Sequence, residues 1–449
     1  MRNTTFIVVK KLVSCCIALM TAGIVATGGA WAAGGQEAKL LASDAAAGDR
    51  FGNAVALEGD TALVGAFANS DNGQFTGSAY VFVRAGNLWT EQAKLLPAEA
   101  EESDNFGWSV ALQGDRALIG AWGDDNAASV AGAVYEFTRE DGVWSETAKL
   151  VASDGSFFAQ FSAVDFDGQA AVIGARGDDE TASNAGAAYI FKRMGGTWSE
   201  QVKLLASDGE SGDRFGSRVA IDGNTVLIAA QDLSTNDKGA AYVFVESNGV
   251  WSEQAKLLPS ASSSIDNFGH SVALEGDTAV VGSPDGSGSG DVYVFTRSNG
   301  VWSETAGLVT QPPAPWDGFG HSVALRGDTL IVGNPFDGFP PGAGSEDPVD
   351  LFGSVSVFER TEDVWVLRGK LLATDDPDGF GVSHSIDLSG DSVLVGAQFD
   401  AEIGTLSGAA YVFRLEMLRP VPAVGRFGAL LLLMAIGAVA YFALRRSTI

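Results

Sequence analysis

The sequence predicts an all-β protein: a seven-bladed β-propeller of four-stranded blades, with the last blade completed by the N-terminal strand and one transmembrane helix near the C-terminus. The first observation behind this prediction is a repeat. A unit occurs seven times at intervals of 51 to 61 residues, and each copy is marked by a phenylalanine: Phe51, Phe106, Phe161, Phe215, Phe268, Phe319 and Phe380. Such a period is typical of a stacked or radial array. The second observation is that the chain starts with the fourth strand of a unit and ends after a third strand, which only a closed ring makes complete.

Each repeat divides into four predicted strands. The first runs from the phenylalanine, as in Phe106–Leu112, to a two-residue Gly-Asp turn. The second is a run of apolar and β-branched residues such as Ala117–Ala121, and a variable loop leads to the third, as in Ala79–Arg84. A Gly-containing turn precedes the fourth, which begins at a tryptophan and continues as in Glu253–Leu258. Segment length, turn chemistry and β-branched content favour strands over helices.

The two ends of the repeat region complement each other. The seventh unit passes through Tyr411–Arg414 and stops without a tryptophan strand. The missing piece matches Gln36–Asp44, which resembles Gln201–Asp208 of a complete unit but has no first three strands before it. We therefore expect one propeller domain over residues 36–416.

Residues 1–32 have the layout of a secretory signal peptide. Arg2, Lys10 and Lys11 give a basic start, residues 12–25 are apolar, and Ala30 and Ala32 form a small-residue cleavage site. Both cysteines of the chain, Cys15 and Cys16, fall inside this segment. The mature protein would then have no thiol for disulfides, metal ligation or nucleophilic catalysis.

A second apolar segment lies at the other end. Residues 427–444 form an uncharged segment that is long enough to span a bilayer. Arg445 and Arg446 follow it, on the side expected to stay cytoplasmic. The predicted transmembrane helix and basic tail cover 427–446, after a linker at 417–426. Together with the signal peptide, this places the repeats outside the cytoplasmic membrane.

The formal net charge of the chain is −28. An acidic surface of this kind argues against nucleic acid and anionic lipid as partners. It favours a soluble domain, which we expect to be monomeric.

Two resemblances follow from these residues. Phe-Gly in the first strand, Val64-Gly65-Ala66 in the second and Tyr-Val-Phe in the third resemble FG-GAP repeats, the propeller units of integrin α-chain heads and of many bacterial surface proteins. This implies an extracellular propeller used for binding. Val421-Pro422 in the linker resembles the motif of IPTL-type C-terminal sorting tails of Gram-negative bacteria, which implies that a membrane protease removes the helix. The expected location is the cell surface, the outer envelope or the medium of a Gram-negative bacterium.

The chain departs from the family in one respect. Many FG-GAP units hold calcium in an Asp-rich loop between the first two strands, whereas this chain has the minimal turns Gly59-Asp60, Gly114-Asp115 and Gly276-Asp277 there. One aspartate cannot supply the oxygens that calcium requires. The calcium sites of the family are therefore not carried over, and no cofactor is expected.

The candidate ligand-binding residues are acids in the loops before the third strand. These loops differ between repeats, as recognition loops do, and we predict that they contact a protein or a glycan: Asp124, Asp125, Asp178, Asp179 and Asp232. Solvated loop charge is the simpler explanation of the same residues. A further set of aspartates, two residues before the repeat phenylalanine, is expected to bond turn amides: Asp49, Asp104, Asp213, Asp266, Asp317 and Asp378.

The three histidines of the chain, His270, His321 and His384, share one repeat position in adjacent blades. Three imidazoles are a candidate metal set. Other blades place Asn53, Trp108 and Ser217 there, however, which favours a tolerant position near the channel over a metal site.

The sequence favours binding over catalysis. It contains no Ser-His-Asp constellation, no phosphate-binding loop and no helical histidine pair. The predicted function is an exported, surface-displayed binding or adhesion propeller. The alternatives are a carbohydrate-active enzyme, a hydrolase or lyase, that uses paired rim carboxylates, and an envelope component without a specific ligand.

Overall fold

The computed structural model describes residues 35–125, 128–231, 239–260, 267–284, 289–310, 317–337, 353–373 and 383–417. They belong to one compact unit, Ala33–Leu418. The predicted signal peptide with Ala30 and Ala32, and the predicted linker and helix with Val421, Pro422, Arg445 and Arg446, lie outside the described residues. Within the described part of the chain, no helix has the length and hydropathy needed to cross a membrane.

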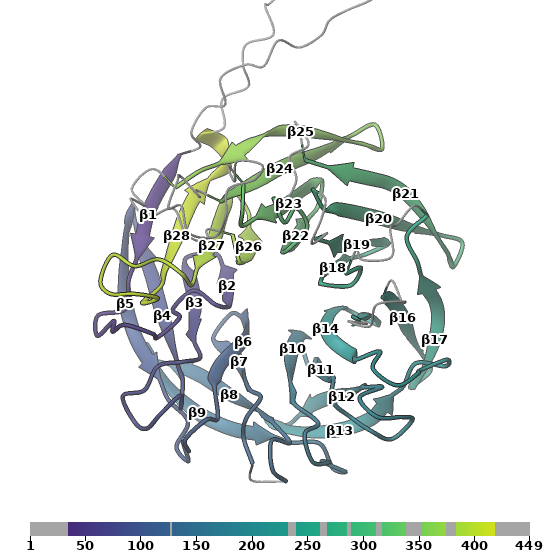
Figure 1. Ribbon diagram of the computed structural model, residues 1–449, viewed down its shortest axis with the longest axis horizontal. Helices are drawn as coiled ribbons and strands as arrows, with labels where there is room; N and C mark the ends of the chain where they lie inside the picture. Colours follow the sequence, from purple (N-terminus) through teal and green to yellow (C-terminus); the bar gives the residue numbers. More distant parts are fainter. Residues whose placement is uncertain are drawn as a thin grey trace, which may run out of the picture. The chain divides into compact units, whose positions relative to one another are not determined.

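The described strands form seven antiparallel four-stranded sheets, arranged as blades around a central channel (Figure 1). The innermost strands of blades 1 to 7 are β2 (Val55–Glu58), β6 (Phe106–Gln113), β10 (Phe161–Asp167), β14 (Phe215–Asp222), β18 (Ser271–Glu275), β22 (Val323–Arg326) and β26 (Ser385–Ser389). The second strands are β3 (Thr61–Ala66), β7 (Arg116–Ala121), β11 (Ala170–Ala175), β15 (Thr225–Ala230), β19 (Thr278–Ser283), β23 (Thr329–Asn334) and β27 (Ser392–Ala397).

The third and fourth strands lie farther from the channel. The third strands are β4 (Ser78–Ala85), β8 (Ala133–Glu140), β12 (Ala187–Met194), β16 (Ala240–Ser247), β20 (Asp291–Ser298), β24 (Ser354–Thr361) and β28 (Ala409–Arg414). The outer strands of the first six blades are β5 (Leu88–Leu95), β9 (Val143–Leu150), β13 (Thr197–Leu204), β17 (Val250–Leu257), β21 (Val301–Val309) and β25 (Val364–Leu371). A 3₁₀ turn, Leu415–Met417, follows β28.

The outer strand of the seventh blade is β1 (Gln36–Leu40), from the start of the described chain. It pairs antiparallel with β28, so that Leu40 faces Ala410 and Gln36 faces Phe413. In Figure 1, β1 and β28 lie side by side at the point where the ring closes. The predicted seven-bladed propeller with an N-terminal closing strand is confirmed.

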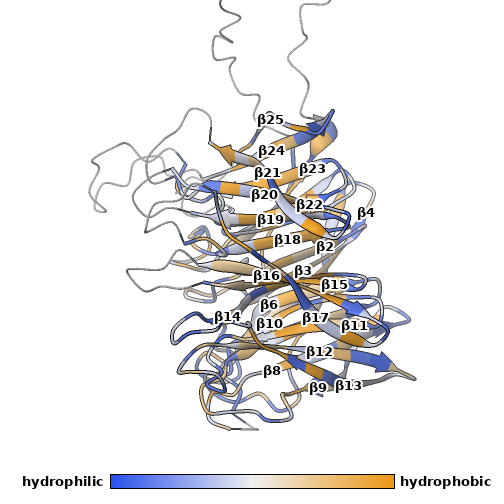
Figure 2. Ribbon diagram, turned by 90° about the vertical axis from the view of Figure 1, so that its right-hand side faces the viewer, coloured by the Kyte–Doolittle hydropathy of each residue, from blue (hydrophilic) through white to orange (hydrophobic). Residues whose placement is uncertain are grey.

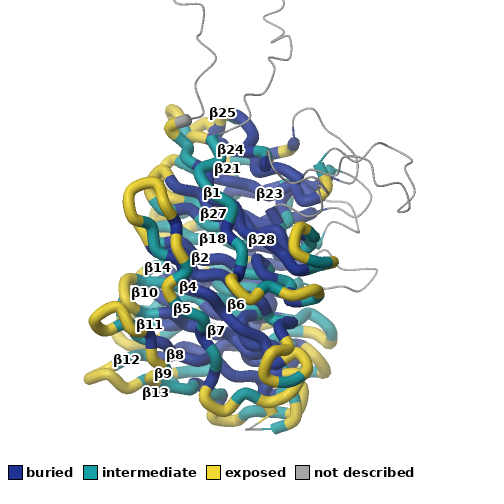
Figure 3. The backbone as a smooth tube through the Cα atoms, turned by 90° about the vertical axis from the view of Figure 1, so that its left-hand side faces the viewer, coloured by how far each residue is buried: buried dark blue, intermediate teal, exposed yellow. Residues whose placement is uncertain are grey.

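Apolar clusters fill the space between neighbouring blades, as the hydropathy colouring of Figure 2 and the burial colouring of Figure 3 indicate. The repeat phenylalanines of blades 1 to 6 each lie in one of these clusters, and Phe380 of blade 7 lies outside the described residues. Phe106, for example, is fully buried and contacts Tyr135 and Phe137 edge-on, at ring-centroid distances of 5.6 and 5.9 Å. Burying an aromatic ring between blades couples each blade to the next.

The repeat glycines allow a close approach between blades. A Cβ added to Gly396 of β27 would lie 2.0 Å from the carbonyl oxygen of Gly52 in blade 1, and one on Gly174 would lie 1.9 Å from that of Gly216. No side chain fits in this space. The glycine of the Val-Gly-Ala segment is therefore required by contact between blades.

The two faces of the ring differ. The short turns between first and second strands and between third and fourth strands lie on one face, which we call the turn face. The longer connections between second and third strands, and between successive blades, lie on the other, which we call the loop face. This division follows from the antiparallel up-and-down order of each sheet.

The turn face repeats one structural unit. In blade 5, Asp277 of the Gly-Asp turn accepts a hydrogen bond from Arg297 Nε at 2.6 Å, and the guanidinium lies 5.0 Å from the ring centre of Trp302. Blades 1, 2 and 6 have the same set: Asp60, Arg84 and Trp89; Asp115, Arg139 and Trp144; Asp328, Arg360 and Trp365. The turn aspartate of these four blades thus binds an arginine of its own blade.

A second turn-face contact links neighbouring blades. The residue before the turn glycine accepts a hydrogen bond from the N–H of the corresponding glycine in the next blade. The acceptor–donor pairs are Glu58–Gly114, Gln113–Gly168, Asp167–Gly223, Asp222–Gly276, Glu275–Gly327 and Ser389–Gly59. The Asp–Arg–Trp unit thus holds a turn to its own blade, and these hydrogen bonds hold the turn to the neighbouring blade.

Candidate functional site

The predicted loop-face aspartates divide into two groups. Asp124 and Asp178 are 0% and 2% exposed, so their side chains face the interior of the blade. Tyr135 Oη donates to Asp124 at 2.6 Å, and Lys149 Nζ lies 2.7 Å from the same carboxylate. In this position a carboxylate anchors the loop to its own blade.

Asp178 is bound in the same way by Lys203 at 2.9 Å and by Tyr189 Oη at 3.3 Å. Asp125 and Asp179, the next residue in each loop, are exposed and available to a partner. Asp232 lies outside the described residues. The structure therefore brings the four described acids to one face, but only the second member of each pair points to solvent.

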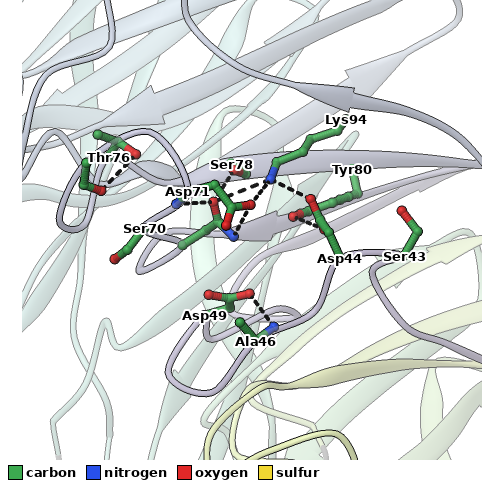
Figure 4. A network of polar contacts seen from close by, with 12 residues as sticks. Ser43, Asp44, Ala46, Asp49, Ser70, Asp71, Thr76, Ser78, Tyr80 and Lys94 are labelled. Atoms are coloured by element: carbon green, nitrogen blue, oxygen red, sulfur yellow. Dashed lines mark hydrogen bonds and ion pairs between the residues drawn. The ribbon is translucent and has the colours of Figure 1, made fainter.

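The anchoring network recurs in other blades, and Figure 4 shows it in blade 1. Lys94 Nζ lies 2.7 Å from Asp44 and 2.5 Å from Asp71, and Tyr80 Oη donates to Asp44 at 2.8 Å. Burial, and then the hydrogen bond to Asp44, raise the pKa of the Tyr80 hydroxyl far above its usual value. The cross-strand Tyr–Lys pair, at register Tyr80 to Lys94, is a signal in the sequence that could have identified this network.

Asp49, Asp104 and Asp213, three of the aspartates before the repeat phenylalanine, have the predicted structural role. Asp317 departs from the prediction, because it is buried and neither of its carboxylate oxygens accepts a hydrogen bond from a backbone amide of the described residues. Asp49 and Asp104 accept hydrogen bonds at 2.8 and 2.7 Å from the N–H groups of Ala46 and Glu101, three residues earlier (Figure 4 shows the first). Asp213 accepts from Glu210 at 2.7 Å. Burial raises the pKa of Asp104 to about 6. Asp266 and Asp378 lie outside the described residues.

A cavity of about 270 Å³ lies in the central channel and is lined by residues from the innermost strands of all seven blades. One tier of its wall is a ring of β-branched side chains: Val55, Val110, Val164, Val219, Val272, Val323 and Ile386. Nearer the loop face, the wall includes Asn53, Trp108, Arg218, His321 and His384. We call this space the channel cavity.

An aromatic group forms one side of the cavity mouth. The ring of Trp108 packs edge-on against Phe67 at a centroid distance of 5.1 Å and against Trp122 at 6.2 Å. Asn53 Nδ2 donates to the backbone carbonyl of Trp108 at 2.9 Å, which fixes the strand that carries the ring. All three rings are only partly buried. Blades 1 and 2 thus present an apolar, polarizable wall.

The three histidines form a column on another side. The ring centroids of His270 and His321 are 4.5 Å apart, and those of His321 and His384 are 4.3 Å apart. Burial is the largest effect that lowers the pKa of all three imidazoles, and repulsion by neighbouring groups that include Arg218 lowers it further. The pKa of His321 falls to about 4. They are therefore neutral near pH 7.

The geometry of this column does not favour a metal site. The imidazole rings are tilted against one another, at interplanar angles of 55° and 46°, and among the described residues no group of three or more His, Cys, Asp or Glu side chains is arranged to hold a metal ion. His270 Nδ1 lies 2.9 Å from Gln231 Nε2; because an amide nitrogen only donates, Nδ1 accepts and Nε2 carries the proton. The sequence favoured a position near the channel that tolerates different residues over a metal-binding set of histidines. The placement of the three histidines at the channel agrees with that interpretation.

Arginines complete the cavity mouth. Arg218 lines the cavity, and burial together with repulsion from Arg176 lowers its pKa to about 10. Arg218 Nη1 donates to the carbonyl of Ser217 at 2.8 Å, and Arg176 Nε donates to Gln160 Oε1 at 2.6 Å. Neither guanidinium forms an ion pair with a carboxylate of the described residues. Two half-buried cations without a countercharge among the described residues are unusual in a chain of net charge −28.

Reasoning from the sequence missed Arg218. Aligning the repeats would have revealed it, because six blades have a small residue at this position: Ala54, Ser109, Ala163, Ser271, Ser322 and Ser385. The serines of blades 2, 5, 6 and 7 use their hydroxyl groups to bond a carbonyl of the next blade. Arg218 is the single large residue in this set.

Two acids lie along the same inner strands, at a position that is alanine in the other five blades. Asp165 accepts hydrogen bonds from Ile221 N and Phe166 N, both at 2.9 Å, and Asp387 accepts from Leu57 N at 2.6 Å and Leu388 N at 2.7 Å. Burial raises the pKa of Asp165 to about 7 and that of Asp387 to about 6, against the opposing effect of these bonds. Neither side chain lines the channel cavity.

The cavity does not offer the chemistry of a glycosidase. Its lining residues in the described part of the chain include no aspartate and no glutamate. Glycoside hydrolysis normally needs two carboxyl groups on either side of the scissile bond. What the cavity does offer is cationic, aromatic and neutral hydrogen-bonding groups, a combination suited to binding.

The chain is similar to the crystal structure of Saccharomyces cerevisiae Sqt1 at 10% sequence identity, with a TM-score of 0.46, over 85% of this chain and 99% of that one. No curated protein matches the sequence. The family model for the FG-GAP repeat matches seven segments, residues 35–82, 89–137, 144–191, 198–244, 251–295, 302–358 and 365–413. These segments cover most of the sequence, and the chain belongs to the FG-GAP repeat family.

Proposed function

We propose that this protein is an exported binding propeller that contacts a protein or glycan ligand through its loop face. The observation that carries the proposal is the contrast between the two faces. The turn face repeats the same Asp–Arg–Trp unit in blades 1, 2, 5 and 6, and those groups bind one another. The loop face differs from blade to blade and surrounds the channel cavity. Variation on a fixed scaffold is the usual arrangement of a recognition surface.

The role of the loop face is binding and not turnover in this proposal. Among the described residues, the channel cavity has no carboxylate in its lining, and the two buried acids Asp124 and Asp178 are already held by lysines. The exposed Asp125 and Asp179 are the acids that a partner can reach. No observation in the described residues favours the carbohydrate-active alternative.

Export is part of the proposal and rests on the terminal segments of the sequence. We infer that residues 1–32 direct the chain across the cytoplasmic membrane and that 427–446 hold it there until the tail is processed. Intact mass spectrometry of the protein from the cell envelope and from the medium tests this. A mature form that starts at Ala33 supports the proposal, and a cytoplasmic form that retains Met1 to Ala32 contradicts it.

Ligand screening tests the binding role. The full chain, purified in a mild nonionic detergent, would be applied to a glycan array and to immobilised envelope extract. A loop-face variant that replaces two carboxylates by amides, Asp125→Asn with Asp179→Asn, is the test. The control is a turn-face variant that loses the same number of charges, Glu140→Gln with Asp141→Asn. The proposal expects a ligand that the first variant loses and the second keeps. Absence of any ligand, or equal loss in both variants, would reject it.

A further inference from the structure

We propose that the channel cavity is a binding site for a monosaccharide-sized carboxylate, the class that uronic acids represent, whether free or at the end of an acidic glycan. The inference rests on the proposed function, because it assigns the ligand chemistry of one part of the loop face. It is drawn from the shape, charge and aromatic lining of the cavity. Each of these restricts the ligand in a different way.

The size of the cavity limits the ligand. A volume of about 270 Å³ lies just below the range of pockets that hold drug-sized molecules, so one ring with its substituents is the largest group that it encloses. The ring of seven β-branched side chains offers no polar side-chain atom to a ligand. The hydrogen-bonding residues of the lining, which include Asn53 and the two histidines, lie nearer the loop face. A polar ligand therefore binds from that side.

The charge of the cavity selects an anion. Arg218 lines the space and Arg176 lies close enough to lower its pKa, yet neither has a carboxylate partner among the described residues. A ligand carboxylate would supply the missing countercharge, and the planar guanidinium of Arg218 can bind it through two hydrogen bonds. The rest of the molecule is strongly acidic, which disfavours ligands with many negative charges. A single carboxylate fits both conditions.

The aromatic wall selects a ring. Trp108 lines the cavity and is braced by Phe67 and Trp122. The negative face of an indole attracts C–H groups that carry partial positive charge, and one face of a pyranose presents a set of such groups. A simple inorganic anion would leave this wall unused.

Neutral polar groups complete the lining. His321 and His384 line the cavity and are uncharged near pH 7. Hydroxyl groups both donate and accept, so a sugar suits a wall of neutral imidazoles and the side chain of Asn53. Carboxylate, ring and hydroxyl groups together describe a uronic acid.

Isothermal titration calorimetry of the full chain in a mild nonionic detergent tests the assignment. The probes are glucuronic acid, its neutral counterpart glucose, acetate, and an oligosaccharide with a terminal glucuronic acid. We expect glucuronic acid to bind at least about tenfold more tightly than glucose or acetate, the loss that removal of one charge-assisted contact typically causes. Tighter binding of the oligosaccharide than of the monosaccharide would identify a glycan end as the source, and equal binding would identify the free acid; both support the site.

Substitutions place the ligand in the cavity. Arg218→Ser installs the residue that blades 5 to 7 carry at this position, and Trp108→His does the same for the aromatic wall. The matched controls are Arg368→Ser, on an exposed arginine of β25, and Trp302→His, on the turn face. We expect Arg218→Ser to lower affinity for glucuronic acid at least about tenfold and to leave the weak binding of glucose unchanged. Melting temperatures establish that each variant is folded.

Three outcomes would overturn the inference: no binding of glucuronic acid, equal binding of glucose or acetate, or full affinity in Arg218→Ser. If the array ligand is lost in the Asp125/Asp179 variant but kept in Arg218→Ser, the channel assignment fails while the binding function stands. If no ligand binds in either experiment, the proposed function fails as well.

Discussion

Lys39 Nζ of β1 lies 2.8 Å from Asp400 Oδ2 in the loop after β27, so an ion pair joins the first strand of the propeller to its last blade. Asp400 is 1% exposed and also accepts a hydrogen bond from Tyr411 at 3.0 Å. The contact repeats the Lys–Tyr–Asp network of the other blades across the point of ring closure. Closure therefore depends on the same chemistry as the interior of a blade.

Replacing Lys39 tests the contribution of this pair. Lys39→Met keeps the length of the side chain and leaves Asp400 buried without its cation, which typically costs about 3–5 kcal/mol. Lys256→Met is the control, because its partner Asp208 is 52% exposed and such a pair contributes at most about 1 kcal/mol. Urea unfolding of both variants measures the difference. Equal stability of the two variants would mean that burial of Asp400 does not control the closure.

The contact between blades at Gly396 gives a second prediction. Gly396→Ala places a Cβ against the carbonyl oxygen of Gly52 and forces blades 7 and 1 apart, so we expect a loss of more than about 3 kcal/mol. Gly307→Ala in β21 is the control, since a Cβ there meets no atom within 4 Å and its φ is not positive. That variant is expected to be neutral or stabilised by about 0.5 kcal/mol. Similar melting temperatures would show that the blades can move apart at little cost.

The turn-face unit gives a third prediction. Asp277 is 67% exposed, so Asp277→Ala is expected to cost less than about 1 kcal/mol. Arg297→Ala is expected to cost about 1–2 kcal/mol, because the guanidinium also stacks on Trp302 and donates to Thr225 of the preceding blade at 3.2 Å. Chemical denaturation measures both. A larger effect of the aspartate would show that the ion pair, and not the stacking, dominates.

The raised pKa of Asp165 predicts a pH dependence of stability. A carboxyl with a pKa of about 7 in the folded protein binds its proton more tightly there than in the unfolded chain. The stability that this proton contributes is fully present below about pH 4, the ordinary pKa of an aspartate, and is lost progressively as the pH rises from there through 7. Asp165→Ala, which installs the residue of five other blades, should therefore gain stability relative to the native chain between pH 5 and pH 8, by on the order of 2 kcal/mol.

Melting temperatures of the native chain, Asp165→Ala and the exposed-site control Asp125→Ala at both pH values measure this effect. The control should follow the native chain at each pH. A constant difference between Asp165→Ala and the native chain would show that Asp165 does not titrate in this range.

Calcium gives a fifth prediction. The Gly-Asp turns engage arginine, and the described residues contain no metal-binding group of His, Cys, Asp or Glu. We expect the melting temperature to be the same in excess calcium and in EDTA. A rise with calcium would locate a site in the chain that these groups do not provide, and would restore the cation that other FG-GAP units hold.

The fold could be predicted because its determinants are repeated. Seven copies of the phenylalanine, five of the Gly-Asp turn and six of the third-strand tyrosine average out local ambiguity, and the displaced strand at Gln36 indicates closure. The role of Asp49 and Asp104 in turns was accessible for the same reason. Features shared by the blades are visible in the sequence.

The site was harder to predict because it consists of departures from the repeat. From the sequence alone, Asp124 and Asp178 resemble surface charges, because the lysines that form ion pairs with them lie on a strand about 25 residues farther along the chain. Only the register of the strands brings each pair together. Arg218 was missed, because its significance depends on its lining the same channel cavity as Trp108 and the histidines. Such convergence of residues from different blades requires the three-dimensional structure.

Hydrogen–deuterium exchange of the full chain, with and without the ligand found on the array, tests most directly which face binds. Binding at the loop face predicts protection of the connections at 121–133 and 175–187, with unchanged exchange at the turns around Asp115 and Gly142. Protection confined to those turns would contradict a loop-face site and move recognition to the opposite face of the propeller.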